Sequence, residues 1–321
     1  MTIVIVAYHA DRWLPRCLES LLAASASRLH LVLVDNSGNT VIPAIDLSGF
    51  DTEVLATPRP MGFAEANNFA LVRAHRLAPY ILFLNQDTVS TPGWVDACTQ
   101  LMDRETSVAA LTPATRDYEL RDWERYFLEC ACRSPAFRAE IENGRVPGGF
   151  YEVPMIPAAA MIVRCETLLE VGPFDPIFVS YYEDYDLCER IRLAGGRIGV
   201  LSGATVGHFS GSASISPAAE RRRARWITRN RVIQELRRPG TSRIGHLIRQ
   251  YGYELPRGIA RSVLGRPGSK PLTAWLLGHI DLLRVVPRVA SARRDRTEWQ
   301  RYLKSQDWTS RITASRGASC N

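Results

Sequence analysis

The stretch TIVIVAYHADRWLPRCLESLLAASASRLHLVLVDNSG, from Thr2 to Gly38, decides the fold. Its two ends, residues 2–8 and 29–38, are short apolar runs bounded by polar residues, a pattern typical of buried strands. Between them, residues 11–26 repeat apolar side chains at helical spacing, which predicts an amphipathic helix. The order strand, helix, strand predicts an α/β protein with a mostly parallel sheet flanked by helices.

The alternation of strand and helix patterns continues along the first half of the chain. The next segments are a strand at 52–58, a helix at 63–77, a strand at 80–87 and a helix at 92–102. On such sheets, ligands bind at the carboxyl ends of the strands. Because Tyr8, Asp35 and Asp87 fall at these ends, the sequence predicts two carboxylates on one rim of the sheet.

A later stretch, FVSYYEDYDLCERI, crowds four acids into the start of a predicted helix. Ser180 and Glu183 have the S-x-x-E spacing of a capping box, in which each side chain satisfies one backbone N–H. Asp186 and Arg190 stand four apart with the acid first, which suits a helical ion pair. Asp184 is left without a structural role of this kind.

Composition indicates a soluble globular protein of one large or two smaller domains, with 321 residues, 46% hydrophobic and 23% charged. The seven cysteines form no C-x-x-C pair, which argues against a zinc ribbon or a disulfide framework and favours reduced thiols. The start MTIVIVAYH has no basic n-region or apolar h-region, and no apolar run approaches the roughly 20 residues of a membrane span. We expect a cytoplasmic protein without a signal peptide.

Charge is distributed unevenly along the chain. Residues 1–216 carry 17 Arg and 26 acids, a net charge of −9, whereas residues 217–321 carry 23 Lys and Arg and 7 acids, a net charge of +16. Glycines in RIGVLSGATVGHFSGS predict two short strands, and from Ser216 onward the pattern is helical and basic, with breaks at prolines including Pro287. We expect a catalytic domain at 1–215 and a helical extension at 216–321.

The basic extension has several potential partners. The segment AWLLGHIDLLRVVPRV predicts an amphipathic helix that could lie on a membrane surface, with its arginines at the lipid headgroups. It could equally pack on the catalytic domain or on a second subunit, giving a homodimer. The arginines lack interleaved aromatic residues, and no recognition motif is present, so nucleic acid is not an expected partner.

Seven blocks in order resemble family 2 of the inverting glycosyltransferases, most closely its bacterial rhamnosyltransferase and galactofuranosyltransferase-like branch. The blocks are IVIVAYHADRWLPRCLESL, LVLVDNSG, MGFAEANNFAL, ILFLNQDT, AAAMIVRCETLLEVGPFD, YYEDYDLCERIRLAGGRI and VGHFSGS. The resemblance covers about Met1 to Arg238. It implies a GT-A fold, a nucleotide-sugar donor, usually a divalent metal, and inversion at the anomeric carbon.

The resemblance also implies roles for individual residues. Asp184 matches the usual general base, with Glu183 as the second candidate, and Asp35 matches the acid that binds the pyrimidine ring. Asp87 and His208 match metal ligands, with Mg²⁺ or Mn²⁺ as the expected ion. Further residues expected near the donor are Ala7, Tyr8, Asn67, Asn68, Asn85, Gln86, Asp186 and Arg229.

Each of these roles has a structural alternative. Asp35 could form a turn with Asn36, Asp87 could cap a strand end, and His208 could be a satisfied core or surface residue. Asn67 and Asn68 could contact the donor or hold the loop over it, Asp186 could orient sugar hydroxyls or its own helix, and the helix of Arg229 could present a solvated basic face. The tyrosines at 181, 182 and 185 could wall the sugar pocket or pack in the core.

The sequence departs from the family pattern at several positions. Asn85 stands where many relatives have Asp, so a single carboxylate remains for the metal. Ala64, Glu65 and Ala66 replace common glycines, His9 replaces Asn, and Ala158 replaces Gly. These changes argue against copying the donor preference of any one relative.

The expected function is transfer of a sugar from a pyrimidine-diphosphate donor to an acceptor hydroxyl, with dTDP-rhamnose as the first candidate and UDP-sugars as the second. The acceptor could be a glycan, a lipid-linked sugar or a small molecule. A nucleotidyltransferase is one alternative, although AYHADRWLP has no glycine to grip a triphosphate. A non-catalytic sugar-nucleotide-binding homologue is another, because Asn85 weakens the metal site.

Overall fold

The computed structural model describes residues 1–36, 45–74, 78–210, 217–237, 242, 245, 248–254, 256–257, 259–260 and 272–291. The chain divides into two compact units. The first unit contains residues 1–176 and 183–211, and the second contains 177–182 and 212–321. The boundary predicted from the sequence, between residues 215 and 216, lies a few residues after the end of the first unit at residue 211. The prediction also assigned residues 177–182 to the first domain, whereas the structure groups them with the second unit.

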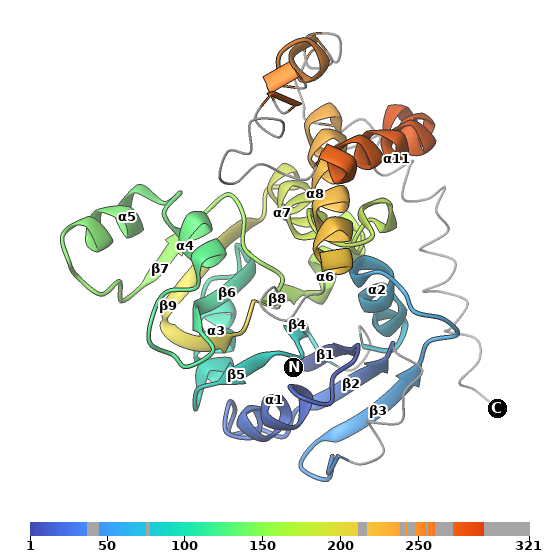
Figure 1. Cartoon of the computed structure of the whole chain (residues 1–321). Helices are drawn as coiled ribbons and strands as arrows, with labels where there is room; N and C mark the ends of the chain where they lie inside the picture. Colours follow the sequence, from blue (N-terminus) through green and yellow to red (C-terminus); the bar gives the residue numbers. More distant parts are fainter. Residues whose placement is uncertain are drawn as a thin grey trace. The chain divides into compact units, whose positions relative to one another are not determined.

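A nine-stranded sheet forms the centre of the first unit (Figure 1). Its strands are β1 (Thr2–Ala7), β2 (His30–Asp35), β3 (Asp51–Ala56), β4 (Tyr80–Asn85), β5 (Thr88–Ser90), β6 (Val108–Asp117), β7 (Phe150–Glu152), β8 (Ala160–Arg164) and β9 (Arg197–His208). The order is β3-β2-β1-β4-β8-β6-β9-β5, with β7 also paired to β9. The strands β3, β2, β1 and β4 are parallel, as the alternating sequence predicts. Beyond β4 the sheet is mixed, because only β6 and β9 pair in parallel.

Helices cover both faces of this sheet. They are α1 (Leu14–Leu21), α2 (Phe63–Ala74), α3 (Trp94–Arg104), α4 (Arg125–Ala131), α5 (Pro135–Glu142), α6 (Cys165–Val171) and α7 (Glu183–Leu193). Alternate residues of the strands face opposite ways, so Val4 and Phe83 join the core under α2, α4, α6 and α7. Ile5 and Leu82 join the core under α1 and α3. Apolar burial on both faces fixes the register of the central strands.

The two short strands predicted around residues 197–208 are one continuous strand, β9. The prediction is wrong because β6 pairs with β9 on both sides of this segment, at residues 197–201 and 205–208, so the glycines do not end the strand. Between Pro113 and Ala114 of β6 the partner on β9 moves from Leu201 to Thr205, which places an irregularity at the glycine-containing segment. The strand then continues to His208.

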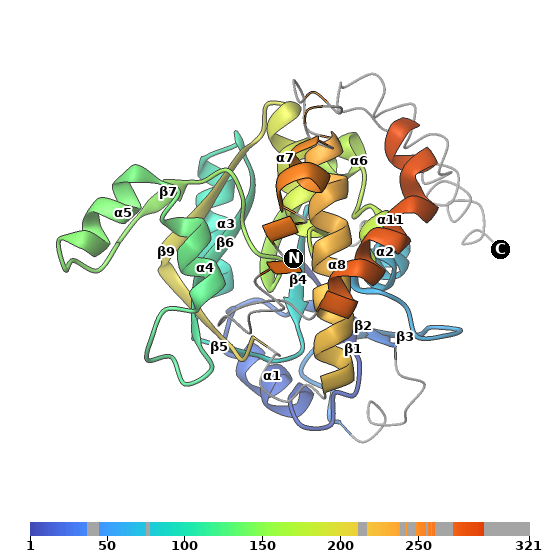
Figure 2. The ribbon, with the colours of Figure 1, turned by 45° about the horizontal axis from the view of Figure 1, so that its top comes forward.

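The second unit is helical in its described part. It contains α8 (Pro217–Arg237), the π-helix η4 (Arg249–Glu254) and α11 (Leu272–Ser291), and α11 packs on α8 (Figure 2). The 3₁₀ turn η2 (Pro176–Phe178) begins at the end of the first unit. The break predicted at Pro287 is wrong, because α11 continues to Ser291. A proline removes one helical hydrogen bond and can bend a helix without ending it.

A buried asparagine holds the segment 177–182 within the second unit. Asn230 is fully buried, and its Nδ2 lies 2.7, 2.8 and 2.7 Å from the carbonyl oxygens of Phe178, Ser180 and Tyr181. Tyr181 and Tyr182 have positive φ angles of 69° and 75°, a backbone conformation that residues other than glycine rarely adopt. The asparagine amide therefore stabilises an unfavourable turn.

Among the helices of the described residues, none has the length and the apolar character that a membrane-spanning helix requires.

Candidate functional site

The carboxyl ends of β1, β2 and β4 lie side by side, as predicted for the rim of the sheet. Ala7 is in register with Asp35, and Val6 is in register with Asn85. The Gln86 side chain accepts a hydrogen bond from the Tyr8 N–H (2.7 Å) and donates one to the Tyr8 carbonyl (2.9 Å). The chain leaving β1 is thereby tied to the chain leaving β4.

Asn36, which the sequence suggested only as a turn former, connects this rim to the start of α2. Its Nδ2 donates to the carbonyl of Met61 (3.0 Å), and its Oδ1 accepts from the Met61 N–H (2.8 Å) and the Thr57 hydroxyl (3.2 Å). The Asp35 carbonyl accepts from the same threonine. An asparagine directly after a strand-end acid is the sequence signal that could have identified this tether, and the structure buries it.

The two predicted metal ligands come together at the edge of the rim. Asp87 Oδ1 lies 3.4 Å from Nε2 of His208, and both side chains are 13% exposed. β5 pairs with the end of β9, which brings Thr88 opposite His208 and lets the Phe209 N–H bond the Asp87 carbonyl (3.0 Å). Asp87 and His208 are therefore held by backbone pairing of two strands far apart in the sequence.

The hydrogen bonds around His208 determine its tautomer. A carboxylate accepts only, so Ser210 Oγ donates to Glu124 Oε1 (2.7 Å) and is left to accept from His208 Nδ1 (3.3 Å). On the other side of the ring, Asn85 Nδ2 lies 3.2 Å and Asp87 Oδ1 lies 3.4 Å from Nε2. With the proton on Nδ1, the single lone pair of Nε2 can accept from the Asn85 amide or bind a cation beside Asp87.

A carboxylate oxygen and an imidazole nitrogen that lie 3.4 Å apart can both contact one cation. Asp87 Oδ1 and His208 Nε2 thus form a donor set that suits a divalent ion such as Mn²⁺ or Mg²⁺. The described residues contain no cluster of three or more His, Cys, Asp or Glu side chains that could hold a metal. A metal at this pair would take its remaining ligands from substrate oxygens and water.

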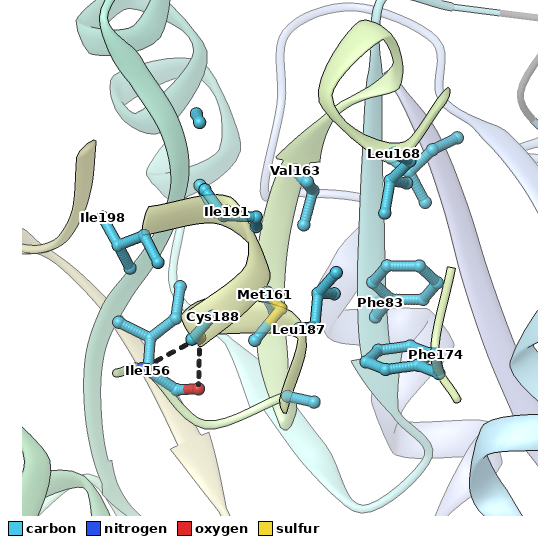
Figure 3. Packing of buried hydrophobic residues seen from close by; sticks show 14 of the residues in the cluster. Phe83, Ile156, Met161, Val163, Leu168, Phe174, Leu187, Cys188, Ile191 and Ile198 are labelled. Atoms are coloured by element: carbon cyan, nitrogen blue, oxygen red, sulfur yellow. Dashed lines mark hydrogen bonds between the residues drawn. The ribbon is translucent and has the colours of Figure 1, made fainter. Parts of the chain in front are cut away.

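The apolar face of α7 fixes the position of its acidic first turn. Leu187 and Ile191 are fully buried and point toward the core that contains Phe83 (Figure 3). The Cys188 thiol accepts from the Ile156 N–H (3.5 Å) and donates to the Ile156 carbonyl (3.7 Å). Since these contacts anchor α7 along one face, its first turn cannot shift without disturbing the core.

Asp184 and Glu183 are both buried in that first turn. Burial raises the pKa of Asp184 to about 6, although the N–H groups of Tyr185 and Ala158 donate to its carboxylate and oppose the rise. Burial also raises the pKa of Glu183 well above its usual value, and the neighbouring charge of Asp184 adds to this rise. Near neutral pH the arrangement keeps Asp184 ionised and favours a protonated Glu183.

The capping box predicted for Ser180 and Glu183 is wrong. The helix begins at Glu183, so this residue occupies the first helical position and not the third. The positive φ angles of Tyr181 and Tyr182 prevent the helix from starting earlier. Oε2 of Glu183 is buried and has no hydrogen-bond partner among the described residues.

The predicted ion pair between Asp186 and Arg190 is confirmed, with 2.8 Å between Oδ2 and Nε. Both side chains are almost fully buried, so the pair lies inside the protein. The same guanidinium donates to three consecutive carbonyls at the end of α6, those of Val171, Gly172 and Pro173 (2.8, 2.7 and 2.7 Å). This geometry supports the second task predicted for Asp186, orientation of its own helix.

The two asparagines of α2 are buried and bonded within the first unit. Asn67 Nδ2 donates to the carbonyl of Phe63 (2.9 Å), one helical turn earlier. Asn68 donates to the Phe174 carbonyl (2.6 Å) and accepts from the Phe174 N–H (3.1 Å). These contacts tie α2 to its own first turn and to Phe174, and the roles predicted for the pair toward the donor stay predictions.

The helix α4 lies close to both candidate centres, which the sequence did not predict. At its start, Glu124 accepts from the Phe127 N–H (2.6 Å) and from Ser210. Two residues along, burial raises the pKa of Tyr126 well above its usual value, and the charge of Asp184 raises it further. The segment 115–150 thus lies near both His208 and Asp184.

An open cavity of about 680 Å³ borders this site in the first unit. His208 and Ser210 form one wall, Glu124 and Trp123 another, and the start of α1 a third.

Arg229, predicted near the donor, belongs to α8 of the second unit and is buried there. Its burial argues against the alternative of a solvated basic face at this position. Gly211 and Ser212 of the HxxGS block lie outside the described residues.

Comparison with known families and curated proteins places this site in context. The family described as "Glycosyltransferase like family 2" matches residues 1–228. A pre-mycofactocin glycosyltransferase of Mycobacterium tuberculosis is 27% identical over 197 residues, covering 58% of this chain and 39% of that protein. An N-acetylglucosaminyl-diphospho-decaprenol L-rhamnosyltransferase of the same organism is 24% identical over 248 residues, covering 68% of this chain and 79% of that protein. The chain thus spans well under half the length of the first of these relatives.

Solved structures share the fold at low sequence identity. TarS of S. aureus superposes with a TM-score of 0.55 and 17% identity, covering 98% of this chain and 54% of TarS. The mannosyltransferase PcManGT of Pyrobaculum calidifontis, solved with GDP-Man and Mn²⁺, gives a TM-score of 0.54 and 13% identity, with 100% of this chain and 87% of that chain covered. The architecture expected from the resemblance, a GT-A fold, is confirmed.

Proposed function

Because this chain belongs to the glycosyltransferase-like family 2, we propose that it transfers a sugar from a nucleotide diphosphate to an acceptor hydroxyl with inversion. The observation that carries the proposal is the pair Asp87 and His208 at the strand ends, with Oδ1 of the aspartate 3.4 Å from Nε2 of the histidine. Such a pair can bind a divalent cation, and a divalent cation would in turn bind the oxygens of a diphosphate.

Asp184 is the proposed general base. In a direct displacement, the acceptor oxygen bonds the anomeric carbon, the bond from that carbon to the diphosphate breaks, and the hydroxyl proton must be removed. The raised pKa of Asp184, about 6, leaves it ionised at neutral pH and makes it a stronger proton acceptor than an ordinary aspartate. The proton passes to its carboxylate, and the nucleoside diphosphate leaves as the anion.

Asp87 and His208 are the proposed ligands of a divalent ion, and the Mn²⁺ in the PcManGT structure supports this choice. Such an ion, when bound, neutralises charge that develops on the leaving diphosphate. The chain itself contributes the orientation of the imidazole, through Ser210 and Glu124, and a backbone that holds the carboxylate beside it.

Asp35 is proposed to bind the pyrimidine ring from the end of β2, since it lies in register with Ala7 beside the tethered Tyr8. The rhamnosyltransferase among the relatives supports rhamnose as the transferred sugar and dTDP-rhamnose as the first donor to test, with UDP-sugars second. Its diphospho-decaprenol acceptor likewise supports a lipid-linked acceptor, ahead of a soluble glycan or small molecule.

Peripheral contact with a membrane is proposed for the second unit. The outer face of α11 exposes apolar side chains, namely Leu276, Leu277, Ile280 and Leu283. Residues 217–321, which include α11, have a net charge of +16. An apolar helix face within a cationic segment suits an anionic bilayer surface, where a lipid-linked acceptor would be located. A homodimer formed through the same face is the alternative partner.

The first experiment is a donor screen without an acceptor. Nucleotide release would be measured from dTDP-rhamnose, UDP-sugars and GDP-mannose, each with Mn²⁺, Mg²⁺ or EDTA. We expect slow release from one pyrimidine donor, lost with EDTA and reduced at least tenfold in Asp87→Asn, whereas the exposed control Asp11→Asn behaves as wild type. Release that neither EDTA nor Asp87→Asn affects would contradict the metal site. No release and no calorimetric binding of any donor would overturn the function.

A further inference from the structure

The chain that leads into α7 has a strained backbone. Half of the residues other than glycine that have positive φ angles in the described chain lie between residues 179 and 182. They are Val179, Tyr181 and Tyr182, with φ angles of 56°, 69° and 75°. A β-branched or bulky residue rarely adopts such a conformation, which persists only where neighbouring contacts impose it. The segment directly before the proposed general base is therefore held by other parts of the protein.

Contacts within the second unit hold this segment. Asn230 is fully buried on α8, and its Nδ2 lies 2.7, 2.8 and 2.7 Å from the carbonyl oxygens of Phe178, Ser180 and Tyr181. Its Oδ1 has no hydrogen-bond partner among the described residues, so the hydrogen bonds of this side chain are directed at the segment. Phe178 also packs against buried side chains of α8 and α11. The helix α8 thus determines the backbone conformation just before α7.

The local sequence favours an earlier start of α7. Ser180 and Glu183 have the spacing of a capping box, in which Ser180 would be the residue before the helix and Glu183 its third residue. Tyr181 and Tyr182 would then have the negative φ angles of helical residues. In the structure the helix begins at Glu183 instead. Two starts of the same helix therefore compete, and the contacts of Asn230 favour the later one.

The two starts use different hydrogen bonds around Asp184. In the earlier start, the carbonyls of Ser180 and Tyr181 would accept from the N–H groups four residues on, those of Asp184 and Tyr185. In the structure, Asn230 binds these two carbonyls, and the Tyr185 N–H donates to the Asp184 carboxylate (2.8 Å). The Asp184 N–H likewise lies against its own carboxylate. Asn230 therefore occupies the acceptors that would otherwise take these N–H groups.

We propose that Asn230 is a positioning residue for the general base, because it fixes the start of α7 at Glu183 and so reserves backbone N–H groups for the Asp184 carboxylate. These N–H groups orient the carboxylate and favour its ionised form, which is the form that accepts a proton. The second unit thereby contributes to catalysis through the chain that leads into α7. The inference rests on the proposed function, in which Asp184 accepts the hydroxyl proton.

Donor hydrolysis tests the inference, since water can replace the acceptor and lose its proton to the same base. Nucleotide release at saturating donor and Mn²⁺ would be compared between wild type and Asn230→Ala, with the full chain and at a temperature where each variant is folded. We expect the maximal rate to fall about tenfold or more, because a misplaced base is a poor one, and the calorimetric Kd of the nucleoside diphosphate to stay within about twofold. An unchanged rate, or an equal loss of nucleotide affinity, would overturn the inference.

Two controls separate positioning from stability. Thr228→Val removes a buried hydroxyl of α8 that has no hydrogen-bond partner among the described residues, and this variant should release nucleotide as wild type does. Asp281→Asn weakens an ion pair between α11 and α8, in which Arg225 Nη2 lies 2.6 Å from Asp281 Oδ1. It should lower the unfolding temperature and keep the rate. If Asp281→Asn slowed release as much as Asn230→Ala, the stability of the second unit would be responsible and the inference would be wrong.

A double-mutant cycle shows whether Asn230 acts through Asp184. In the Asp184→Asn background, Asn230→Ala should change the rate by less than about twofold, because the group that Asn230 positions is already replaced. Losses that multiply would show that Asn230 acts elsewhere, against the inference.

A glycine variant tests the competing helix start. In the Tyr181→Gly background, the loss caused by Asn230→Ala should shrink about threefold or more, since glycine adopts positive φ angles freely and disfavours the earlier start. An equal loss in both backgrounds would contradict the competition on which the inference depends.

The outcomes separate the inference from the function on which it rests. If Asp184→Asn slows nucleotide release and Asn230→Ala does not, Asn230 has no positioning role and the proposed function stands. If Asp184→Asn releases nucleotide at the wild-type rate, the assignment of the general base is wrong. If wild type releases no nucleotide from any donor, the transferase proposal fails, whatever the variants show.

Discussion

The two units of this protein use their polar side chains in different ways. In the first unit, polar groups that are buried or partly buried converge on strand ends, where Asp87, His208, Ser210 and Glu124 form one connected series of contacts. In the described part of the second unit, cations dominate and apolar side chains lie exposed on α11. A chain of directed hydrogen bonds can set one proton position, whereas a cationic and apolar surface can only favour a class of partner.

The largest expected effect concerns Asp184, the proposed general base in the first turn of α7. Asp184→Asn should lower acceptor-dependent transfer by about 10³-fold and leave donor binding within about twofold of wild type, because an amide cannot accept the hydroxyl proton. The wild-type rate should rise with pH through about 6, the raised pKa of Asp184, and then level off. Initial rates across pH and donor titrations measure both quantities.

A control on the same helix distinguishes chemistry from folding. Glu189→Gln, farther along α7 and only partly buried, should retain wild-type transfer and the same pH profile. If Asp184→Asn kept most of the activity, or lost donor binding as well, Asp184 would not be the general base. Glu183→Gln would then become the variant to test, since Glu183 shares the buried first turn.

The same contrast explains how far sequence alone could predict the protein. The apolar runs around Val4 and Leu33 could be buried only as parallel strands, so the first half of the fold followed from pattern. The continuous strand β9 did not, because its pairing with β5, β6 and β7 depends on partners distant in the chain. Pattern is local, whereas the register of a mixed sheet is set by tertiary packing.

Among the site residues, those at strand ends could be predicted, and those that orient them could not. Asp87 follows a recognisable strand and His208 follows from the family resemblance, but nothing in the spacing of Glu124 and Ser210 connects them. Similarly, the capping box at Ser180 failed because Tyr181 and Tyr182 adopt positive φ angles that Asn230 stabilises from far along the sequence. Contacts of this kind become visible only once the chain is folded.

The second prediction concerns Glu124, which stands at the end of the contact series Asp87, His208, Ser210 and Glu124. Glu124→Gln keeps an oxygen for the Phe127 N–H but removes the charge that draws the Ser210 proton, so the His208 tautomer is no longer enforced. We expect Mn²⁺ affinity in the presence of nucleotide to fall about tenfold, in line with losses of carboxylates behind metal-binding histidines. Nitrogen NMR of the His208 ring should show the Nδ1–H form decreasing.

The matched control for Glu124→Gln is Glu129→Gln, the same substitution on the same helix. Glu129 is 61% exposed and pairs only at the surface with Arg125, so Mn²⁺ affinity and the imidazole spectrum should stay as in wild type. Unchanged Mn²⁺ affinity in Glu124→Gln would limit Glu124 to capping α4. A change in the ring spectrum without a change in affinity would show that Asp87 alone determines metal binding.

The smallest expected effect concerns the surface of the second unit. Ile280 and Leu283 are 48% and 69% exposed, and burying such side chains in a bilayer interface stabilises binding by about 1 kcal/mol each. Ile280→Asn/Leu283→Asn should therefore weaken co-sedimentation with anionic phosphatidylglycerol vesicles by roughly five- to thirtyfold, and neutral vesicles should bind little of either protein. Leu169→Asn, a 53% exposed leucine of the first unit, is the matched control and should bind as wild type. If wild type ignores anionic vesicles while the double variant changes the mass measured by light scattering, α11 is an interface between two copies and the membrane proposal is wrong.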